Sequence, residues 1–280
     1  MNLFQDRKLV IATKHKKDAV IYPILEEKLK VQCCIPLELD TDLLGTFTGE
    51  IERKKDVLTT LREKCFLAMK EMNCDLAIAS EGSFGAHPTI FFGHADDEVL
   101  IFMDTKNDIE IIARELSTDT NFNGSEITNE IELLEFAKKV NFPSHALILK
   151  SSENNFSKVI KGITDENQLL ENFRSIVNEY GTAYVETDMR ALFNPTRMQV
   201  IKIATEKLVD TILSLCPECQ APGFTVSEVK QGLPCEWCNY PTRSTLSFIY
   251  TCKKCNHSSE KIHPHNKTKE DPMYCDFCNP

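Results

Sequence analysis

Short apolar runs alternate with stretches of helical period along residues 8–209 of the 280-residue chain. In residues 55–72, apolar side chains recur every three or four positions, which predicts an amphipathic helix. The run CDLAIAS (74–80) that follows is short and continuously apolar at its centre, as in a buried strand. The same reasoning predicts further strands at 8–13, 31–37, 98–104, 108–116, 145–150 and 182–187, and further helices at 18–30, 127–140, 166–179 and 195–215.

This alternation of strands and helices is typical of an α/β fold. The strands at 98–104 and 108–116 are separated only by a short polar turn, so they should pair antiparallel. The sheet is therefore expected to be mixed and flanked by helices. Pro195 suits the first turn of the last helix, and the α/β domain is expected to span residues 1–209.

Cysteine is distributed very unevenly. Eight of the 12 cysteines lie in the last 65 residues, as four CxxC units. A CxxC unit presents two thiolates to one metal ion, and two units complete a tetrahedral four-thiolate zinc site. Residues 210–280 are therefore predicted to form two structural zinc ribbons, with these ligands: Cys216, Cys219, Cys235, Cys238, Cys252, Cys255, Cys275 and Cys278.

The spacing leaves open which CxxC units share a zinc ion. Sequential matching, 216–238 and 252–278, gives two ribbons of familiar length and is the favoured arrangement. Crossed or nested matching also fits, because the gap between the second and third units is short. The remaining cysteines lack metal-ligand spacing and are expected to be buried as small apolar residues: Cys33, Cys34, Cys65 and Cys74.

Composition and charge limit the classes of molecule that the chain is expected to bind. A content of 42% hydrophobic and 26% charged residues is typical of a soluble globular protein, and we expect a cytoplasmic location where thiols stay reduced. The net charge is −10, and residues 210–280 carry 7 Lys and Arg against 8 Asp and Glu. Nucleic-acid binding needs clustered positive charge, so we expect the ribbons to dock on a protein partner or to stabilise the fold instead, and expect no membrane association.

Four polar segments follow or precede the predicted strands: 12–17, 40–56, SEGSFGAHP (80–88) and 186–198. Strand ends of an α/β sheet lie side by side, so loops at these ends are expected to form a polar pocket for an anionic ligand. A glutamate in a glycine-rich turn can also be a simple cap, and Asn194 suits a helix N-cap. The candidate catalytic residues are Glu50 and Glu81, and the candidate ligand-binding residues are Lys14, Lys17, Ser80, Ser83, His87, Arg190, Asn194 and Arg197.

The strings ATKHKK (12–17), DTDLLGTFTGEIER (40–53), ASEGSFGAHP (79–88) and ETDMRALFNPTRM (186–198), followed by the CxxC units, resemble a bacterial family catalogued as domain of unknown function 6671. The resemblance covers nearly the whole chain. It implies the same arrangement of an α/β domain and C-terminal zinc ribbons, and it implies no particular activity.

The order of elements is also similar to that of the pyrophosphatases that clear inosine-type nucleoside triphosphates. That resemblance implies that Lys14 and Lys17 grip phosphates and that Glu50 and Glu81 hold Mg²⁺. Two function classes therefore stand: metal-dependent hydrolysis of a phosphate ester or nucleotide, and a non-enzymatic binding module whose ribbons dock on a partner. Metal-dependent turnover would distinguish them.

Overall fold

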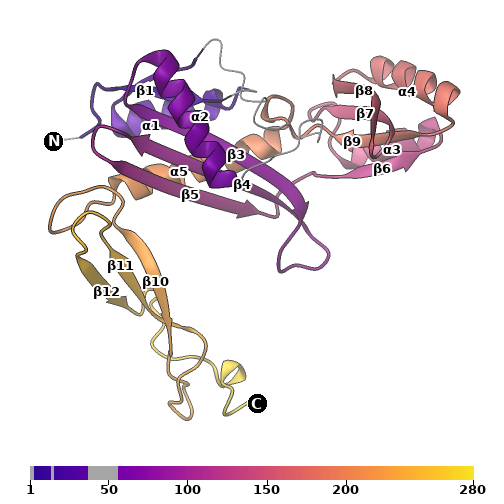
Figure 1. Cartoon of the computed structure of the whole chain (residues 1–280). Helices are drawn as coiled ribbons and strands as arrows, with labels where there is room; N and C mark the ends of the chain where they lie inside the picture. Colours follow the sequence, from indigo (N-terminus) through magenta and orange to yellow (C-terminus); the bar gives the residue numbers. More distant parts are fainter. Residues whose placement is uncertain (1–2, 14–15, 37–55) are drawn as a thin grey trace. The chain divides into compact units, whose positions relative to one another are not determined.

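The computed structural model describes residues 3–13, 16–36 and 56–280. The chain divides into two compact units, Met1–Val209 and Asp210–Pro280. Figure 1 traces the chain from the N-terminal sheet to the C-terminal ribbon. Among the described helices, none combines the length and the hydropathy that a membrane span needs.

The first sheet is mixed and has five strands in the order β2-β1-β3-β4-β5. Strand β1 (Lys8–Ala12) is parallel to both β2 (Gln32–Cys34) and β3 (Leu76–Ala86). Strands β4 (His94–Asp104) and β5 (Ile109–Ser117) complete the sheet by antiparallel pairing. The predicted α/β fold with a mixed sheet is thus confirmed.

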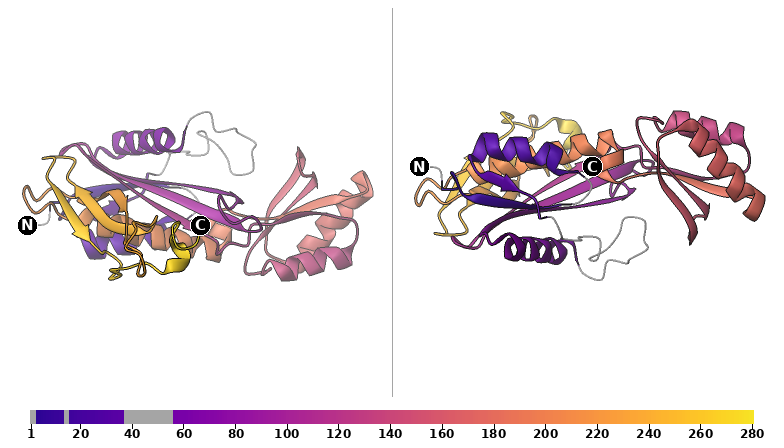
Figure 2. Two further views of the ribbon diagram at one scale, coloured as in Figure 1. Left: turned by 90° about the horizontal axis from the view of Figure 1, so that it is seen from below. Right: turned by 90° about the horizontal axis from the view of Figure 1, so that it is seen from above.

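Helices cover both faces of this sheet, as the two views of Figure 2 show. Helix α2 (Val57–Met72) lies on one face, and α1 (Asp18–Leu29) lies with α5 (Pro195–Leu213) on the other. The amphipathic period of α2 explains its position, because Leu61, Cys65 and Ala68 pack with alternate residues of the sheet in one buried cluster.

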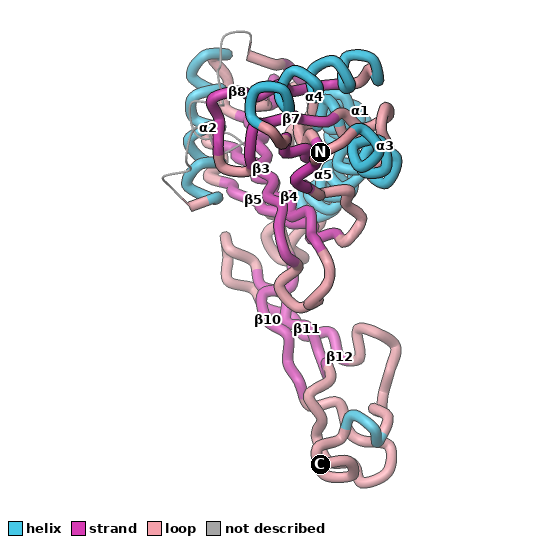
Figure 3. Tube along the Cα trace, turned by 90° about the vertical axis from the view of Figure 1, so that its right-hand side faces the viewer, coloured by secondary structure: helices cyan, strands magenta, loops and turns pink. Residues whose placement is uncertain are grey.

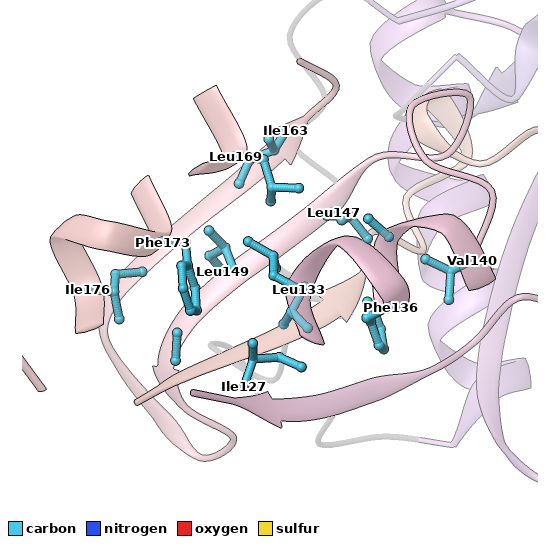
Figure 4. Close-up of a cluster of buried hydrophobic side chains, with 13 residues drawn as sticks. Ile127, Leu133, Phe136, Val140, Leu147, Leu149, Ile163, Leu169, Phe173 and Ile176 are labelled. Carbon is cyan, nitrogen blue, oxygen red and sulfur yellow. The ribbon is translucent and has the colours of Figure 1, made fainter. Parts of the chain in front are cut away.

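The strands after residue 123 do not extend the first sheet but form a second one, in the order β6-β9-β7-β8. It consists of β6 (Gly124–Ile127), β7 (Leu147–Ser152), β8 (Asn155–Ile163) and β9 (Ala183–Thr187), all paired antiparallel. Helices α3 (Glu130–Lys139) and α4 (Glu166–Tyr180) pack on it around the apolar cluster of Figure 4. Strand β8 is half-exposed and polar at its start, so its hydrophobic pattern was too weak to predict it.

The segment 80–88 is the main correction to the expected elements. It was predicted as a loop, but β3 continues to Ala86 and pairs with β4 along its whole length, from Leu76↔Asp104 to Ala86↔His94. The two glycines and the polar residues suggested a turn. They instead form the distal half of a long hairpin, in which Ser80 and Glu81 pair with lysines of α2 and the start of α1.

The second unit is a three-stranded antiparallel sheet with long loops at both ends, visible in Figure 3. Its strands are β10 (Thr225–Gln231), β11 (Thr245–Thr251) and β12 (Ser258–Ile262). Two short 3₁₀ helices complete the described elements of the chain, η2 (Ala191–Phe193) before α5 and η3 (Pro272–Tyr274) near the C-terminus.

Candidate functional site

The eight C-terminal cysteines gather in two groups of four, and within each group all sulfur atoms lie within 4.8 Å of one another. The first cysteine cluster consists of Cys216, Cys219, Cys252 and Cys255, and the second cysteine cluster consists of Cys235, Cys238, Cys275 and Cys278.

The sulfur geometry of both clusters suits a tetrahedral metal ion. A zinc ion with bonds of about 2.3 Å to four thiolates places its sulfur atoms about 3.8 Å apart. The Sγ atoms of Cys216 and Cys255 are 3.6 Å apart, and those of Cys238 and Cys275 are 3.7 Å apart. Each cluster can therefore hold a metal ion with four thiolates.

The clusters are interleaved along the chain, so the predicted sequential matching of CxxC units is wrong. The reason is the register of the ribbon. Thr225 of β10 pairs with Thr251 of β11, which brings the chain before β10 and the chain after β11 to the same end. Sequential matching would have to connect opposite ends of β10, a seven-residue strand about 24 Å long.

A separate group of charged and polar side chains lies on the face of the first sheet that α1 and α5 cover. We call it the charged centre, and it consists of Lys17, Ser80, Asp96, Glu98 and Arg197. Residues 96 and 98 are two apart on β4, so their side chains share one face, and Ser80 on β3 opposes Leu100 beside them. All five side chains are buried.

Arg197 and Glu98 form the innermost ion pair of this centre. The Arg197 Nε–H donates to Glu98 Oε1 at 2.6 Å, and its NH1 group donates to the Met189 carbonyl at 2.5 Å. Both side chains are fully buried. The start of α5 fixes the arginine, since the Arg197 backbone N–H donates to the Asn194 side chain at 3.0 Å.

Lys17 comes from the start of α1 and meets the same centre. Its Nζ donates to Ser80 Oγ at 3.0 Å and lies 3.8 Å from Glu98 Oε2. Burial lowers the pKa of Lys17 to about 8, although Glu98 acts in the opposite direction. Lys17 therefore stays mostly protonated at neutral pH but gives up its proton more readily than an ordinary lysine.

Asp96 is the most unusual group of the centre. It is 0% exposed, and neither carboxylate oxygen has a hydrogen-bond partner among the described residues. Burial raises the pKa of Asp96 to about 8, with Glu98 adding to the rise and Arg197 opposing it. A buried carboxyl without partners is costly, so its presence calls for a reason other than stability.

Gly82 makes room for the ion pair above the sheet. A methyl group at this position would collide with the Glu98 carboxylate and the Arg197 guanidinium. Gly82 suggested a turn in the sequence, but in the structure its missing side chain lets the Glu98–Arg197 pair lie close to β3.

Glu81 lies on the opposite face of β3, toward α2. It is 5% exposed and forms an ion pair with Lys64, which sequence reasoning did not single out. Both groups nevertheless influence the pKa of Lys17, so they lie within electrostatic reach of the charged centre.

The structure brings Lys17, Ser80 and Arg197 together and leaves three other candidates apart. Ser83 is exposed on β3. His87 organises the tip of the β3–β4 hairpin, where its Nδ1 accepts the Ile90 N–H at 3.0 Å. Arg190 pairs with Asp188 at 2.6 Å.

Three further candidates need separate mention. Asn194 is buried and caps α5, as its alternative interpretation held, while its Nδ2 donates to Asn121 Oδ1 at 2.8 Å. Lys14 and Glu50 lie outside the described residues.

Sequence reasoning missed Asp96 and Glu98 as candidates. The signal was present in HADDEVLIFMD (94–104), where three consecutive carboxylates precede an apolar strand. Because 80–88 was expected to be a loop, the opposing strand was started only at residue 98, and the two carboxylates were not placed against Gly82 and Phe84.

A row of rings leads from the charged centre to a cavity. Arg197 lies over the Phe84 ring at 5.0 Å, Phe84 stacks on Phe122 at 5.9 Å, and His94 meets Phe122 edge-on at 5.3 Å. His94 and Phe122 line a cavity of about 260 Å³ together with Asn121 and residues around it. His94 stands on the same face of β4 as Asp96 and Glu98.

Comparison with known proteins adds a family but no activity. The family model described as a domain of unknown function, number 6671, matches residues 64–280, which include β3, β4, α5 and all eight clustered cysteines. Among curated proteins, the comparison finds no match to the chain.

Proposed function

The chain belongs to the family of domain of unknown function 6671, and we propose that its charged centre binds a phosphate-bearing, nucleotide-like ligand with a divalent cation and hydrolyses it. The observation that carries this proposal is Asp96, a fully buried carboxyl whose two oxygen atoms have no partner among the described residues. Such a group is stabilised when a ligand supplies the missing partner.

Two helix starts and two cations favour a phosphate at this position. Lys17 is the N-cap of α1, and Arg197 lies in the first turn of α5. A helix N-terminus carries a partial positive charge, which favours a bound anion nearby. Arg197 already holds its guanidinium rigidly by its bonds to Glu98 and Met189.

The two carboxylates favour a hard cation beside that phosphate. Mg²⁺ is bound through one or two protein carboxylates together with substrate phosphates, and Asp96 and Glu98 offer oxygen atoms on one face of β4. When bound, such a cation would neutralise phosphate charge in the reaction. Glu81 and Lys64, on the far face of β3, would tune the field at Lys17.

Hydrolysis also needs a residue that accepts the proton of the attacking water molecule. A water molecule that attacks phosphorus must lose a proton while the bond from phosphorus to the leaving oxygen breaks. Asp96, whose pKa is about 8, is mostly protonated at neutral pH in the ligand-free chain, so it would accept this proton in its ionised form, which a bound cation would favour. Lys17 and Arg197 would hold the negative charge that develops on the phosphate oxygens.

The ring row favours a nucleotide over a simple phosphate ester. Phe84, Phe122 and His94 extend from Arg197 toward the 260 Å³ cavity, and aromatic faces stack on nucleobases. In this proposal the phosphate lies near Lys17 and Arg197, and the base packs near His94 and Phe122.

We further propose that both cysteine clusters hold zinc and serve the fold rather than the chemistry. All four ligands of each cluster are cysteines, and catalytic zinc usually keeps one position for water or substrate. All 12 cysteines are free of disulfide bonds, which also favours a reducing compartment such as the cytoplasm.

The test is a panel of ATP, GTP, inosine triphosphate and UTP, each with and without added Mg²⁺. A ligand at 100 times its Kd raises the free energy of unfolding by about 2.7 kcal/mol, which a thermal shift detects.

Ser80→Ala should weaken the thermal shift because Ser80 holds Lys17, while the matched Ser83→Ala, exposed on the same strand, should leave it unchanged. Release of phosphate or pyrophosphate then separates an enzyme from a binding module. No shift with any of the four in Mg²⁺ would contradict the proposal.

A further inference from the structure

The second cysteine cluster is surrounded by exposed aromatic side chains. In each of its two CxxC units, the residue before the last cysteine is aromatic, Trp237 in one and Phe277 in the other, and these are 76% and 69% exposed. The ring of Tyr240 stacks on that of Phe277 at 5.8 Å. We call this surface the aromatic end, and it consists of Trp237, Tyr240, Met273, Tyr274 and Phe277, all more than half exposed.

The first cysteine cluster provides an internal comparison, because it has the same metal-ligand geometry but a different surface. Its CxxC units carry Pro217, Glu218, Lys253 and Lys254 at the equivalent positions. Its aromatic residue Phe224 packs against Tyr250 and the buried cysteines instead of facing solvent. A metal knuckle of this ribbon therefore does not require exposed aromatics, and those of the aromatic end need a separate explanation.

Acidic side chains accompany the exposed rings. Glu236 precedes Trp237 and Asp276 precedes Phe277, so both CxxC units present an acid followed by an aromatic residue, and both acids are exposed. Residues 233–243 and 264–280 hold four carboxylates against three cations. Four thiolates around one dication add about two further negative charges.

We propose that the aromatic end binds a basic, arginine- or lysine-rich segment of a partner protein. Guanidinium and ammonium groups are attracted to the faces of Trp and Tyr, and the neighbouring carboxylates complement their charge. Trp and Tyr are also the residues that most often carry binding energy at protein interfaces. Single-stranded nucleic acid would stack on the same rings, but its phosphates would meet a negative surface.

The chain offers its own probe of this surface, because Trp237 is its only tryptophan. An arginine decapeptide titrated into the full, metal-loaded chain should change the Trp237 emission saturably, and added salt should weaken the binding. A glycine–serine decapeptide should have no effect. Phe277→Ser should weaken binding at least tenfold while the metal content stays unchanged.

A matched pair of variants tests whether the peptide binds at the aromatic end or responds only to the overall negative charge of the second unit. Glu236→Gln should weaken peptide binding several-fold, because this acid stands beside Trp237. Glu218→Gln removes an exposed acid from a CxxC unit of the first cluster and should leave binding unchanged. The proposal is overturned if the emission does not respond to millimolar peptide, if both variants weaken binding equally, or if a thymidine decanucleotide binds as tightly as the peptide.

Discussion

The charged centre and the cysteine clusters both gather ionisable side chains at close range, but they depend on the rest of the chain in opposite ways. The charged centre rests on an apolar framework, in which α2 packs on one face of the first sheet and α1 with α5 on the other. In the second unit, one buried cluster contains little beyond Cys216, Ala221 and Cys252, with Phe224 packed against it. Two of the three buried residues of that cluster are therefore cysteines.

This difference indicates where each unit obtains its stability. In the first unit, charges are a cost that a large core offsets, so single changes in the centre should destabilise without abolishing the fold. In the second unit, we expect metal binding at the cysteine clusters to supply the folding free energy, so loss of ligands should unfold the unit outright.

The largest effect is expected from removing cysteines in pairs. Cys216→Ser with Cys252→Ser removes two of the four proposed ligands of the first cluster, so elemental analysis should find one zinc ion per chain instead of the two expected for the parent. Cys216→Ser with Cys235→Ser leaves three thiolates in each cluster, so tight binding should be lost at both and the ribbon should unfold, because zinc binding in such sites is worth about 10–16 kcal/mol. Sequential matching predicts the reverse order, and hydrogen exchange should show the first unit still protected in both variants.

A smaller but substantial loss is expected when Arg197 is removed. Arg197→Met leaves Glu98 as a buried carboxylate without its main partner, which typically costs about 3–5 kcal/mol of unfolding free energy. The control is Arg114→Met on β5, since Arg114 pairs with Asp97 at the surface at 2.7 Å and such pairs contribute about 0–1 kcal/mol. Urea unfolding of both variants measures the difference, and equal losses would mean that the Arg197 pair is not buried.

A loss of about 1–3 kcal/mol is expected from Gly82→Ala, because the added methyl group must displace the Glu98–Arg197 pair. Gly85 provides the matched control on the same strand, since a methyl group there meets nothing within 4 Å. Urea midpoints should fall for Gly82→Ala and stay within about 0.5 kcal/mol of the parent for Gly85→Ala. Two equal midpoints would contradict the close packing above β3.

The last prediction concerns how the unfolding free energy changes with pH. The raised pKa of Asp96 means that the folded chain binds one more proton than the unfolded chain between about pH 4 and 8, so this group's stabilisation declines as the pH rises through that window. The lowered pKa of Lys17 acts in the opposite direction between about pH 8 and 10.5. Each slope is at most about 1.4 kcal/mol per pH unit, because one proton is involved.

Unfolding free energies measured from pH 5 to 10 should therefore pass through a minimum near pH 8. Asp96→Asn should remove the decline below pH 8, and Lys17→Met should remove the rise above it. A profile of the parent protein that Asp96→Asn does not alter would show that Asp96 titrates with an ordinary pKa.

The parts of the molecule that the sequence predicted are those with local signals. The helical period of 57–72 and the four CxxC units depend on neighbours in the chain. The matching of the CxxC units depends on which strands pair, as the β10–β11 register shows, and a local pattern carries no such information.

The charged centre was predicted in part for the same reason. Lys17, Ser80 and Arg197 were singled out because they flank strands and a helix start, and the fold brings them together. Asp96 and Glu98 became visible only when β3 was seen to continue past Ser80 and to align with β4. Their burial is a tertiary property that an acidic run in a sequence does not indicate.

The most direct test of a ligand site at the charged centre compares two neighbouring carboxylates on β4. Asp96 is fully buried in the centre, whereas Asp97 points to the opposite face and pairs with Arg114. Titration calorimetry of the full chain with Mg²⁺ and ATP, GTP, inosine triphosphate or UTP should detect binding that Asp96→Asn abolishes and Asp97→Asn preserves. Binding by the parent that survives Asp96→Asn unchanged would contradict the placement of the site.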